Sequence, residues 1–146
     1  VKGHIIKFIL IVLTLMFSVA APVFADPVAT QIINDIRKDK RRKPVRYSTQ
    51  LEGVAKAHAD EMASKGYFSH TGANGSTVGS RTTAQGYKWC FVAENIAQGQ
   101  RSLEQVMAGW RSSKGHYKNI IHKKAREFGL ARGAGNTWVM VLAAPC

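Results

Sequence analysis

One amphipathic helix constrains the fold of this chain more than any other feature of its sequence. Residues 49–66 read TQLEGVAKAHADEMASKG, and Thr49 and Glu52 have the spacing of a capping box. Apolar side chains then recur at helical spacing, at Leu51, Val54, Ala55, Ala59 and Met62. Gly66 can end the helix. The segment therefore predicts a capped helix with one buried face, which a sheet or other helices must cover.

His58 lies on the apolar stripe of this helix. An imidazole there can be a ligand, but a core histidine held by one hydrogen bond is the commoner arrangement. We expect the structural role for His58.

Two further helices are predicted on either side of a long loop. Asp26 and Pro27 can open the first, with Val28, Ile32 and Ile36 on one face. Ser102-x-x-Gln105 is a capping box that opens the second, whose face carries Leu103, Val106, Met107 and Trp110. Between them, residues 67–86 are rich in Gly, Ser and Thr, which predicts a loop with one short helical turn.

Strands close the chain. After a short helical turn that follows Gly115, FGLARG (128–133) and TWVMVLA (137–143) flank three residues, which is typical of a hairpin. We expect Trp110 and Trp138 to belong to the core. Helices first and strands last indicate an α+β fold.

The first 25 residues are predicted to be a signal peptide. Lys2 and Lys7 precede a long apolar run, and Val23-Phe24-Ala25 places small residues where a signal peptidase cuts. An uncleaved membrane anchor is the alternative. Export, to the periplasm or out of the cell, leaves one domain at 26–146.

The exported domain is strongly basic. Without Lys2 and Lys7 the net charge of +12 falls to +10, and part of it lies in RKDKRRKPVR at 37–46. This run could bind anionic envelope polymers or lipids through Arg37, Lys38, Lys40, Arg41, Arg42, Lys43 and Arg46. A solvated helix end and loop is the commoner explanation of such a run. We expect no nucleic-acid partner, because no nucleic-acid-binding motif is present.

Cys90 and Cys146 are the two cysteines of the chain. An even count in an oxidising compartment predicts one disulfide, which would stabilise the fold by about 4 kcal/mol. A free thiol or an intermolecular bridge is the alternative.

The segment CFVAENIAQG (90–99) places Glu94 among apolar residues. An unpaired carboxylate there is costly to bury, so it needs a partner. Asn95 beside it could orient Glu94, although turn formation is the commoner role of asparagine.

Four motifs in order resemble the CAP superfamily of cysteine-rich secretory proteins, venom allergens and plant pathogenesis-related proteins, and most closely its bacterial secreted single-domain branch. They are HADEMASKGYFSH, CFVAENIAQG, GWRSSKGHYKNII, and FGLARG with TWVMVLA. The resemblance implies a three-layer α-β-α sandwich with a central antiparallel sheet. It also implies a central cleft with two histidines and two glutamates.

Carried over to this sequence, the cleft residues are His70, Glu94 and His116. The position of the second glutamate is Ser113, so the set of four is incomplete, and His58 matches no cleft position. Two imidazoles beside Glu94 could compensate its charge as an ion-paired cluster. Alternatively, His70, Glu94 and His116 could bind a divalent metal such as zinc, with one coordination position open.

Three functions are compatible with these residues. The first is an exported binding module whose cleft takes an unidentified ligand or a metal. The second is a hydrolase that uses His70, Glu94 or His116 to activate water; the sequence has no H-E-x-x-H or G-x-S-x-G motif, and a nucleophilic Ser69 or Ser113 would need confirming geometry. The third is lipid binding, as in some members of the superfamily.

Overall fold

The computed structural model describes residues 26–146, so the predicted signal peptide at 1–25 lies outside the described residues. The helices are α1 (Pro27–Asp39), α2 (Thr49–Lys65), α3 (Val78–Ala84), α4 (Leu103–Ser112) and α5 (Lys114–Ile120). The strands are β1 (Arg46–Tyr47), β2 (Trp89–Gln98), β3 (Glu127–Gly133) and β4 (Thr137–Pro145). A 3₁₀ turn, Ala134–Asn136, joins β3 to β4 as the predicted hairpin.

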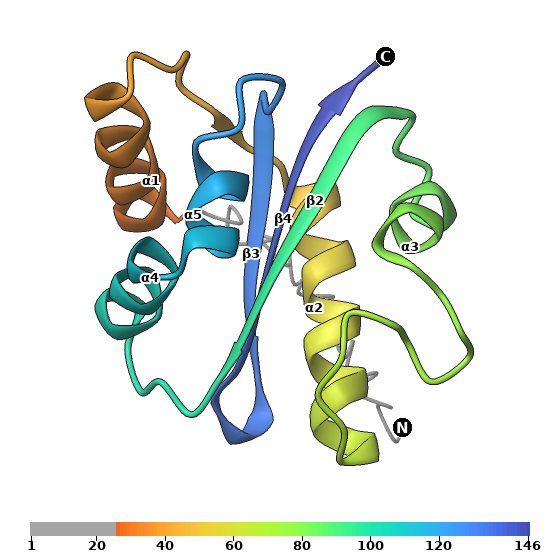
Figure 1. The fold of residues 1–146 in the computed structure, drawn as a ribbon. Helices are drawn as coiled ribbons and strands as arrows, with labels where there is room; N and C mark the ends of the chain where they lie inside the picture. Colours follow the sequence, from red (N-terminus) through yellow and green to blue (C-terminus); the bar gives the residue numbers. More distant parts are fainter. Residues whose placement is uncertain (1–25) are drawn as a thin grey trace, which may run out of the picture.

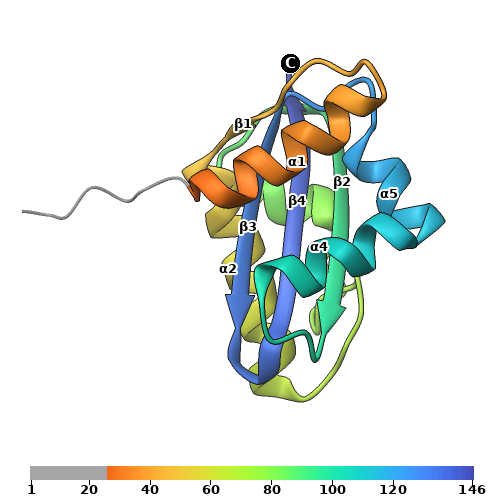
Figure 2. The same ribbon diagram turned by 90° about the vertical axis from the view of Figure 1, so that its left-hand side faces the viewer.

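The strands form one sheet between two layers of helices, in the order β1-β3-β4-β2. Figure 1 shows α2 and α3 on one face of this sheet and α1, α4 and α5 on the other. In Figure 2 the layer of α1, α4 and α5 faces the reader. The three-layer α-β-α sandwich is therefore confirmed. Three strands pair antiparallel, as expected, while the two-residue β1 adds a parallel pairing with β3. This order leaves β2 at an edge.

Helix α2 buries the face that its sequence predicts: Leu51, Val54, Ala55, His58, Ala59 and Met62. Gly66 ends the helix with a φ of 68°, a conformation that glycine adopts without strain. The predicted capping box is wrong by one residue. Ser48 is the N-cap, and its hydroxyl accepts from the backbone N–H of Leu51 at 3.3 Å.

Helix α2 lies close against β3 because that strand carries glycine at the contact. A Cβ atom on Gly129 would lie 2.0 Å from the backbone nitrogen of Glu52. Only a residue without a side chain fits there, which fixes the layer of α2 close to the sheet.

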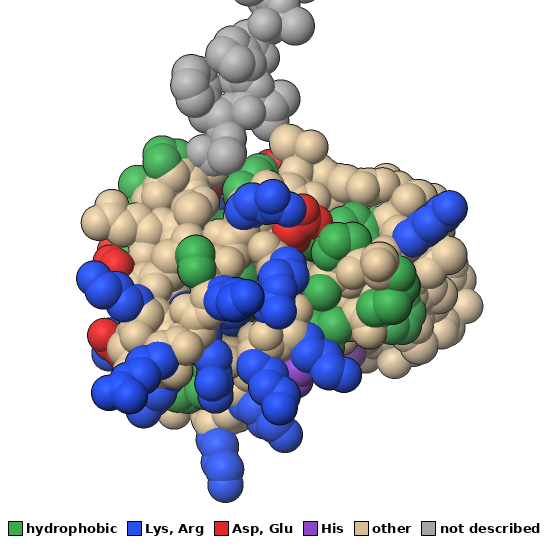
Figure 3. All heavy atoms as spheres, turned by 90° about the horizontal axis from the view of Figure 1, so that it is seen from above, with side chains coloured by type: hydrophobic (Ala, Val, Ile, Leu, Met, Phe, Trp, Pro, Cys, Tyr) green, Lys and Arg blue, Asp and Glu red, His purple; other side chains and the backbone are tan. Residues whose placement is uncertain are grey.

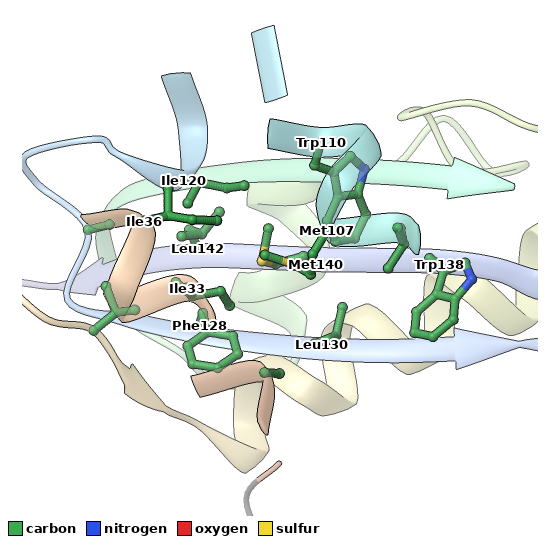
Figure 4. Close-up of a cluster of buried hydrophobic side chains, with 14 residues drawn as sticks. Ile33, Ile36, Met107, Trp110, Ile120, Phe128, Leu130, Trp138, Met140 and Leu142 are labelled. Atoms are coloured by element: carbon green, nitrogen blue, oxygen red, sulfur yellow. The ribbon is translucent and has the colours of Figure 1, made fainter. Parts of the chain in front are cut away.

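The opposite face of the sheet carries the larger aromatic core, in which Trp110 and Trp138 are both buried (Figure 4). Helix α1 packs here through Ala29, Ile33 and Ile36, whereas Val28 is 51% exposed. The predicted stripe through Val28 and Ile32 is thus rotated by one residue. Two adjacent apolar stripes shared Ile36, and packing against the sheet selected one of them.

The predicted loop at 67–86 contains more helix than expected. Its single predicted turn is the seven-residue α3, which Thr77 and Ser80 begin with a capping box. Small polar residues conceal this helix in the sequence because they are poor helix formers in its interior.

Cys90 and Cys146 form the predicted disulfide, with their Cα atoms 4.8 Å apart. It joins the start of β2 to the end of the chain beside β4. Among the described residues, no helix combines the length and the apolar composition that a bilayer crossing requires.

Candidate functional site

Glu94 lies in the middle of the edge strand β2, and its side chain is only 2% exposed. Both carboxylate oxygens are occupied. Nδ1 of His70 lies 2.8 Å from one oxygen, and Nη2 of Arg81 donates to the other at 2.7 Å. The buried charge is therefore paired and hydrogen-bonded at both oxygens, which offsets the cost of its desolvation.

Arg81 is a partner of Glu94 that the sequence did not predict. It extends from α3, and its guanidinium also donates to the backbone oxygens of Ser76 at 2.9 Å and His70 at 3.0 Å. One side chain thus holds both Glu94 and the loop that carries His70. A signal for it existed, since Arg81 is the one Lys, Arg, Asp or Glu in residues 67–86.

His70 connects this buried pair to solvent, because its side chain is 57% exposed. Nδ1 donates a hydrogen bond to the carboxylate of Glu94, which fixes the orientation of the ring. Nε2 lies on the far side of the ring and has no hydrogen-bond partner among residues 26–146. His70 therefore presents an oriented nitrogen to solvent.

Asn95 positions the second histidine of the predicted site. It is fully buried within β2, donates to the backbone oxygen of His116 at 3.1 Å, and accepts from Asn119 at 2.9 Å. The same Asn119 amide donates to the backbone oxygen of Glu94 at 3.2 Å. The predicted turn role for Asn95 is wrong, because its amide attaches α5 to the edge strand.

His116 approaches the cleft from α5, in the helix layer opposite to α3. Burial lowers the pKa of His116, and the charge of His70 lowers it further. Of the predicted site residues, the structure pairs His70 with Glu94 and Arg81, whereas His116 lines a separate hollow. No hydrogen bond joins the ring of His116 to Glu94 in the part of the chain that the structure describes.

A hollow that His116 lines contains buried apolar side chains and more exposed polar ones. Phe68, which is 48% exposed, lies in its wall. The other lining residues are Ile96, Ala97, Gln98, Gln100, Val106, Gly109, Trp110, Ser113 and His116. The cleft can hold a ligand with apolar and polar groups side by side.

His58 has the structural role expected of it. It is 1% exposed, and its Nε2 donates to the backbone oxygen of Ser69 at 2.9 Å. Burial lowers its pKa, so the neutral imidazole is favoured. His58 supports the loop before His70 and does not reach the cleft as a ligand.

Neither candidate nucleophile is activated by an imidazole. The hydroxyl of Ser69 accepts from the backbone N–H of Thr71 at 3.0 Å. Ser113 connects α4 to α5 and lines the cleft. Within residues 26–146, no hydrogen bond joins either hydroxyl to a histidine ring, so the geometry that nucleophilic catalysis needs is not formed.

The arrangement around Glu94 does not fit a zinc ion. Both of its oxygens bind donors, and one of these is the cation of Arg81. In the described residues, no three side chains of His, Cys, Asp or Glu lie together as a ligand set. The zinc site at His70, Glu94 and His116 stays a prediction that this geometry does not favour.

The groove between α1 and α4 is the place where a lipid could lie between helices. Its floor contains Ile32, Ile36 and Met107, but its rim contains the acidic side chains of Asp35, Asp39 and Glu104. Arg111 is the one basic residue of the lining, and its guanidinium lies 3.7 Å from Asp39. A lipid with a carboxylate head would meet like charge here, so the groove does not favour this ligand.

One member of the basic run is not available to a partner. Arg37 is fully buried, and its guanidinium donates to four backbone oxygens within the protein: those of Lys43, Ile120, His122 and Ala125. The expectation that Arg37 contacts an anionic surface is therefore wrong. The remaining lysines and arginines of the run are exposed.

Comparison with known proteins decides the family. The family model described as "CAP: Cysteine-rich secretory protein family" matches residues 30–142. The chain belongs to the CAP family. The resemblance inferred from its four motifs is confirmed.

Three bacterial proteins are similar to this chain, one in sequence and two in fold. The uncharacterized protein YkwD of Bacillus subtilis is 28% identical over 109 residues, which are 74% of this chain and 42% of YkwD. An extracellular SCP-domain protein of Bacillus anthracis has a TM-score of 0.75 at 23% identity, over 80% of this chain and 39% of that one. An outer surface protein of Borrelia burgdorferi has a TM-score of 0.74 at 22% identity, over 82% of this chain and 91% of that one. This chain thus spans less than half the length of the two Bacillus proteins.

Proposed function

We propose that this CAP protein is an exported binding module whose ligand lies in the cleft beside β2. The descriptions of an extracellular and an outer surface relative support export. The observation that supports the binding role is the oriented, half-exposed His70, held by Glu94 and Arg81 two residues after Phe68, which lines an apolar hollow. A folding role alone does not require an exposed imidazole held by a buried ion pair.

The cleft selects for a ligand of mixed character. Phe68 and the apolar floor offer contact to a hydrophobic group, while His116, Ser113 and Gln100 offer hydrogen bonds nearby. Burial favours neutral His116, which can then both donate and accept. Short peptides present such groups together, and they are the ligand class that we propose.

Selection from a library of random heptapeptides displayed on phage tests the proposal with the oxidised 26–146 protein. Selected peptides should bind in solution, and Phe68→Ser and His116→Ala should each weaken binding about tenfold or more, as loss of a central contact does. His122→Asn is the matched control, because this histidine lies outside the cleft lining, and it should change affinity less than twofold.

Failure to select peptides, or selected peptides that bind both cleft variants as well as the wild type, would contradict the proposal. Circular dichroism of each variant shows whether lost binding reflects lost folding.

One observation favours a hydrolase as the second candidate. A buried carboxylate that orients Nδ1 of His70 leaves Nε2 free to accept a proton from water, which is the geometry of a general base. Mass spectrometry of the selected peptides after incubation tests this. Cleavage that His70→Gln abolishes without loss of binding would support the hydrolase, whereas intact peptides with the wild type would leave binding as the function.

A further inference from the structure

A second surface, at the end of the molecule where α1 meets β1 and α5 meets β3, carries most of the exposed positive charge. Figure 3 shows lysine and arginine side chains gathered over this end. Ten exposed residues contribute: Lys38, Lys40, Arg41, Arg42, Lys43, Arg46, Lys118, Lys123, Lys124 and Arg126. We call these ten residues the basic end. Four of them come from residues 118–126, far along the chain from the run at 37–46.

Buried hydrogen bonds join the two segments into one unit. The guanidinium of Arg37, beneath the first segment, donates to Ile120 O at 2.6 Å and Ala125 O at 3.3 Å in the second. At the surface, Nε of Arg42 donates to Ile121 O at 3.0 Å. The backbone N–H of Arg46 donates to Arg126 O at 2.9 Å. The two segments therefore present their charges in a fixed relation.

Few acidic groups neutralise this charge. Glu127 pairs with Arg46 at 3.1 Å and also accepts from Tyr87, and Asp39 lies 3.7 Å from Arg111 of α4. The positive groups act on one another. After burial, the charges of Arg126 and Arg42 lower the pKa of Arg37 to about 10. The fold thus keeps cations together against their mutual repulsion, which an anionic partner would relieve.

The basic end also contains a hollow with the character of an anion subsite. Lys43, Arg46 and Arg126 line it, together with Pro44 and Pro145. Arginine binds phosphate oxygens in pairs, and lysine adds a point charge. Arg126 is held in place by bonds from Nη1 to Lys123 O and Ala125 O, both at 2.8 Å.

We propose that the basic end is a docking surface for a linear, phosphate-bearing polymer of the cell envelope. Its ten cations extend over two segments, and a single small anion is too short to contact all of them. Successive phosphates of one polymer chain can bind them together. A membrane surface fits less well, because attachment to lipid usually adds exposed aromatic or large aliphatic side chains. In the described part of the chain, the exposed large hydrophobic residues are Val28, Phe68 and Trp89, and none belongs to either segment.

Fluorescence anisotropy with labelled, lipid-free poly(glycerol phosphate) tests this inference. Affinity should fall steeply as salt rises, because each neutralised phosphate releases counterions. The pairs Lys40→Gln with Lys43→Gln, and Lys123→Gln with Lys124→Gln, should each weaken binding about tenfold at low salt and lower its salt dependence. Arg101→Gln with Lys114→Gln removes the same charge outside the basic end and should change affinity less than threefold.

The second pair is the decisive one, since only the fold places it beside the first. If its effect equals that of the control pair, the two segments do not form one surface and the proposal fails. Tighter binding to phosphatidylglycerol vesicles than to the polymer would assign the surface to membranes. Equal binding of heparin or single-stranded DNA would overturn the preference for an envelope phosphate polymer. His116→Ala should leave polymer binding unchanged, which separates this test from that of the cleft.

Discussion

Among residues 26–146, Glu94 and Arg37 are the buried side chains that carry charge, and they are stabilised in different ways. Glu94 in the cleft is bound by groups that are or can become cationic, since Arg81 and His70 occupy its two oxygens. Arg37 beneath the basic end has no carboxylate partner among the described residues and donates to four backbone oxygens. The charge of Glu94 is therefore neutralised by its neighbours. Arg37, in contrast, is stabilised by neutral backbone dipoles, and its positive charge is retained.

This difference determines which ligands each region favours. A cancelled pair has little long-range field, so recognition in the cleft depends on shape, hydrogen bonds and the exposed nitrogen of His70. A solvated, uncancelled cation adds to the field of the exposed lysines and arginines around it and attracts anions from a distance. One small fold thus carries two regions that favour ligands of different chemistry, which is the basis of both proposals.

The largest expected effect is that of Arg37→Met. It leaves four backbone oxygens without their donor and should lower the free energy of unfolding by about 3 kcal/mol or more, measured by urea denaturation. Lys38→Met, at an exposed neighbouring position, should stay within about 0.5 kcal/mol of the wild type. Equal effects of the two variants would show that the buried guanidinium does not hold the two segments together.

Glu94→Leu should have the next largest effect, about 2–3 kcal/mol, because it leaves the largely buried Arg81 without its counterion. The double variant Glu94→Leu with Arg81→Met should lose less than the sum of the single variants, since no charge remains unpaired. Urea denaturation of the four proteins gives the coupling energy. Additive losses would mean that the two charges do not stabilise one another.

A smaller effect concerns the pH dependence of stability at the basic end. Burial lowers the pKa of His122 below its ordinary value of 6.5, and the charges of Lys124, Lys118, Lys123 and Arg37 lower it further. The unfolded chain therefore binds a proton more readily, and stability present above pH 6.5 is lost as the pH falls through that value.

His122→Asn should accordingly show a shallower loss of stability than the wild type between pH 7 and 5. Added salt should reduce the difference in stability loss between the two proteins, because it screens the neighbouring cations. The part of the difference that is due to burial of His122 should remain. Thermal or urea denaturation across this range provides the measurement. Parallel curves for the two proteins would rule out His122 as the source.

The smallest expected signal is that of zinc in the cleft. Because Arg81 and His70 already occupy the oxygens of Glu94, calorimetry at neutral pH should show no stoichiometric binding to the wild type. The heats should match those of His70→Ala and His116→Ala. Stoichiometric binding that both variants lose would instead establish the zinc site predicted from the sequence.

Local sequence patterns predicted much of the fold. The stripe of α2, the closing hairpin and the cysteine pair each depend on neighbouring residues or on a count, and all three are confirmed. The face of α1 and the length of α3 were not predicted correctly. In α1 two overlapping stripes are apolar, and contacts with the sheet decided which of them is buried. In α3 small polar residues concealed the helix, so its length depends on contacts with the rest of the protein.

The sequence by itself determined the family, the α+β order of elements, the disulfide and the requirement that Glu94 have a partner. The fold was needed to show that Arg81 joins His70 as a partner of Glu94, that Arg37 is buried beneath the basic run, and that residues 118–126 extend this run into one surface. The reason is physical. Periodicity and capping act over a few residues and can be read along the chain, whereas the pairing of charges depends on distances between segments that only folding brings together.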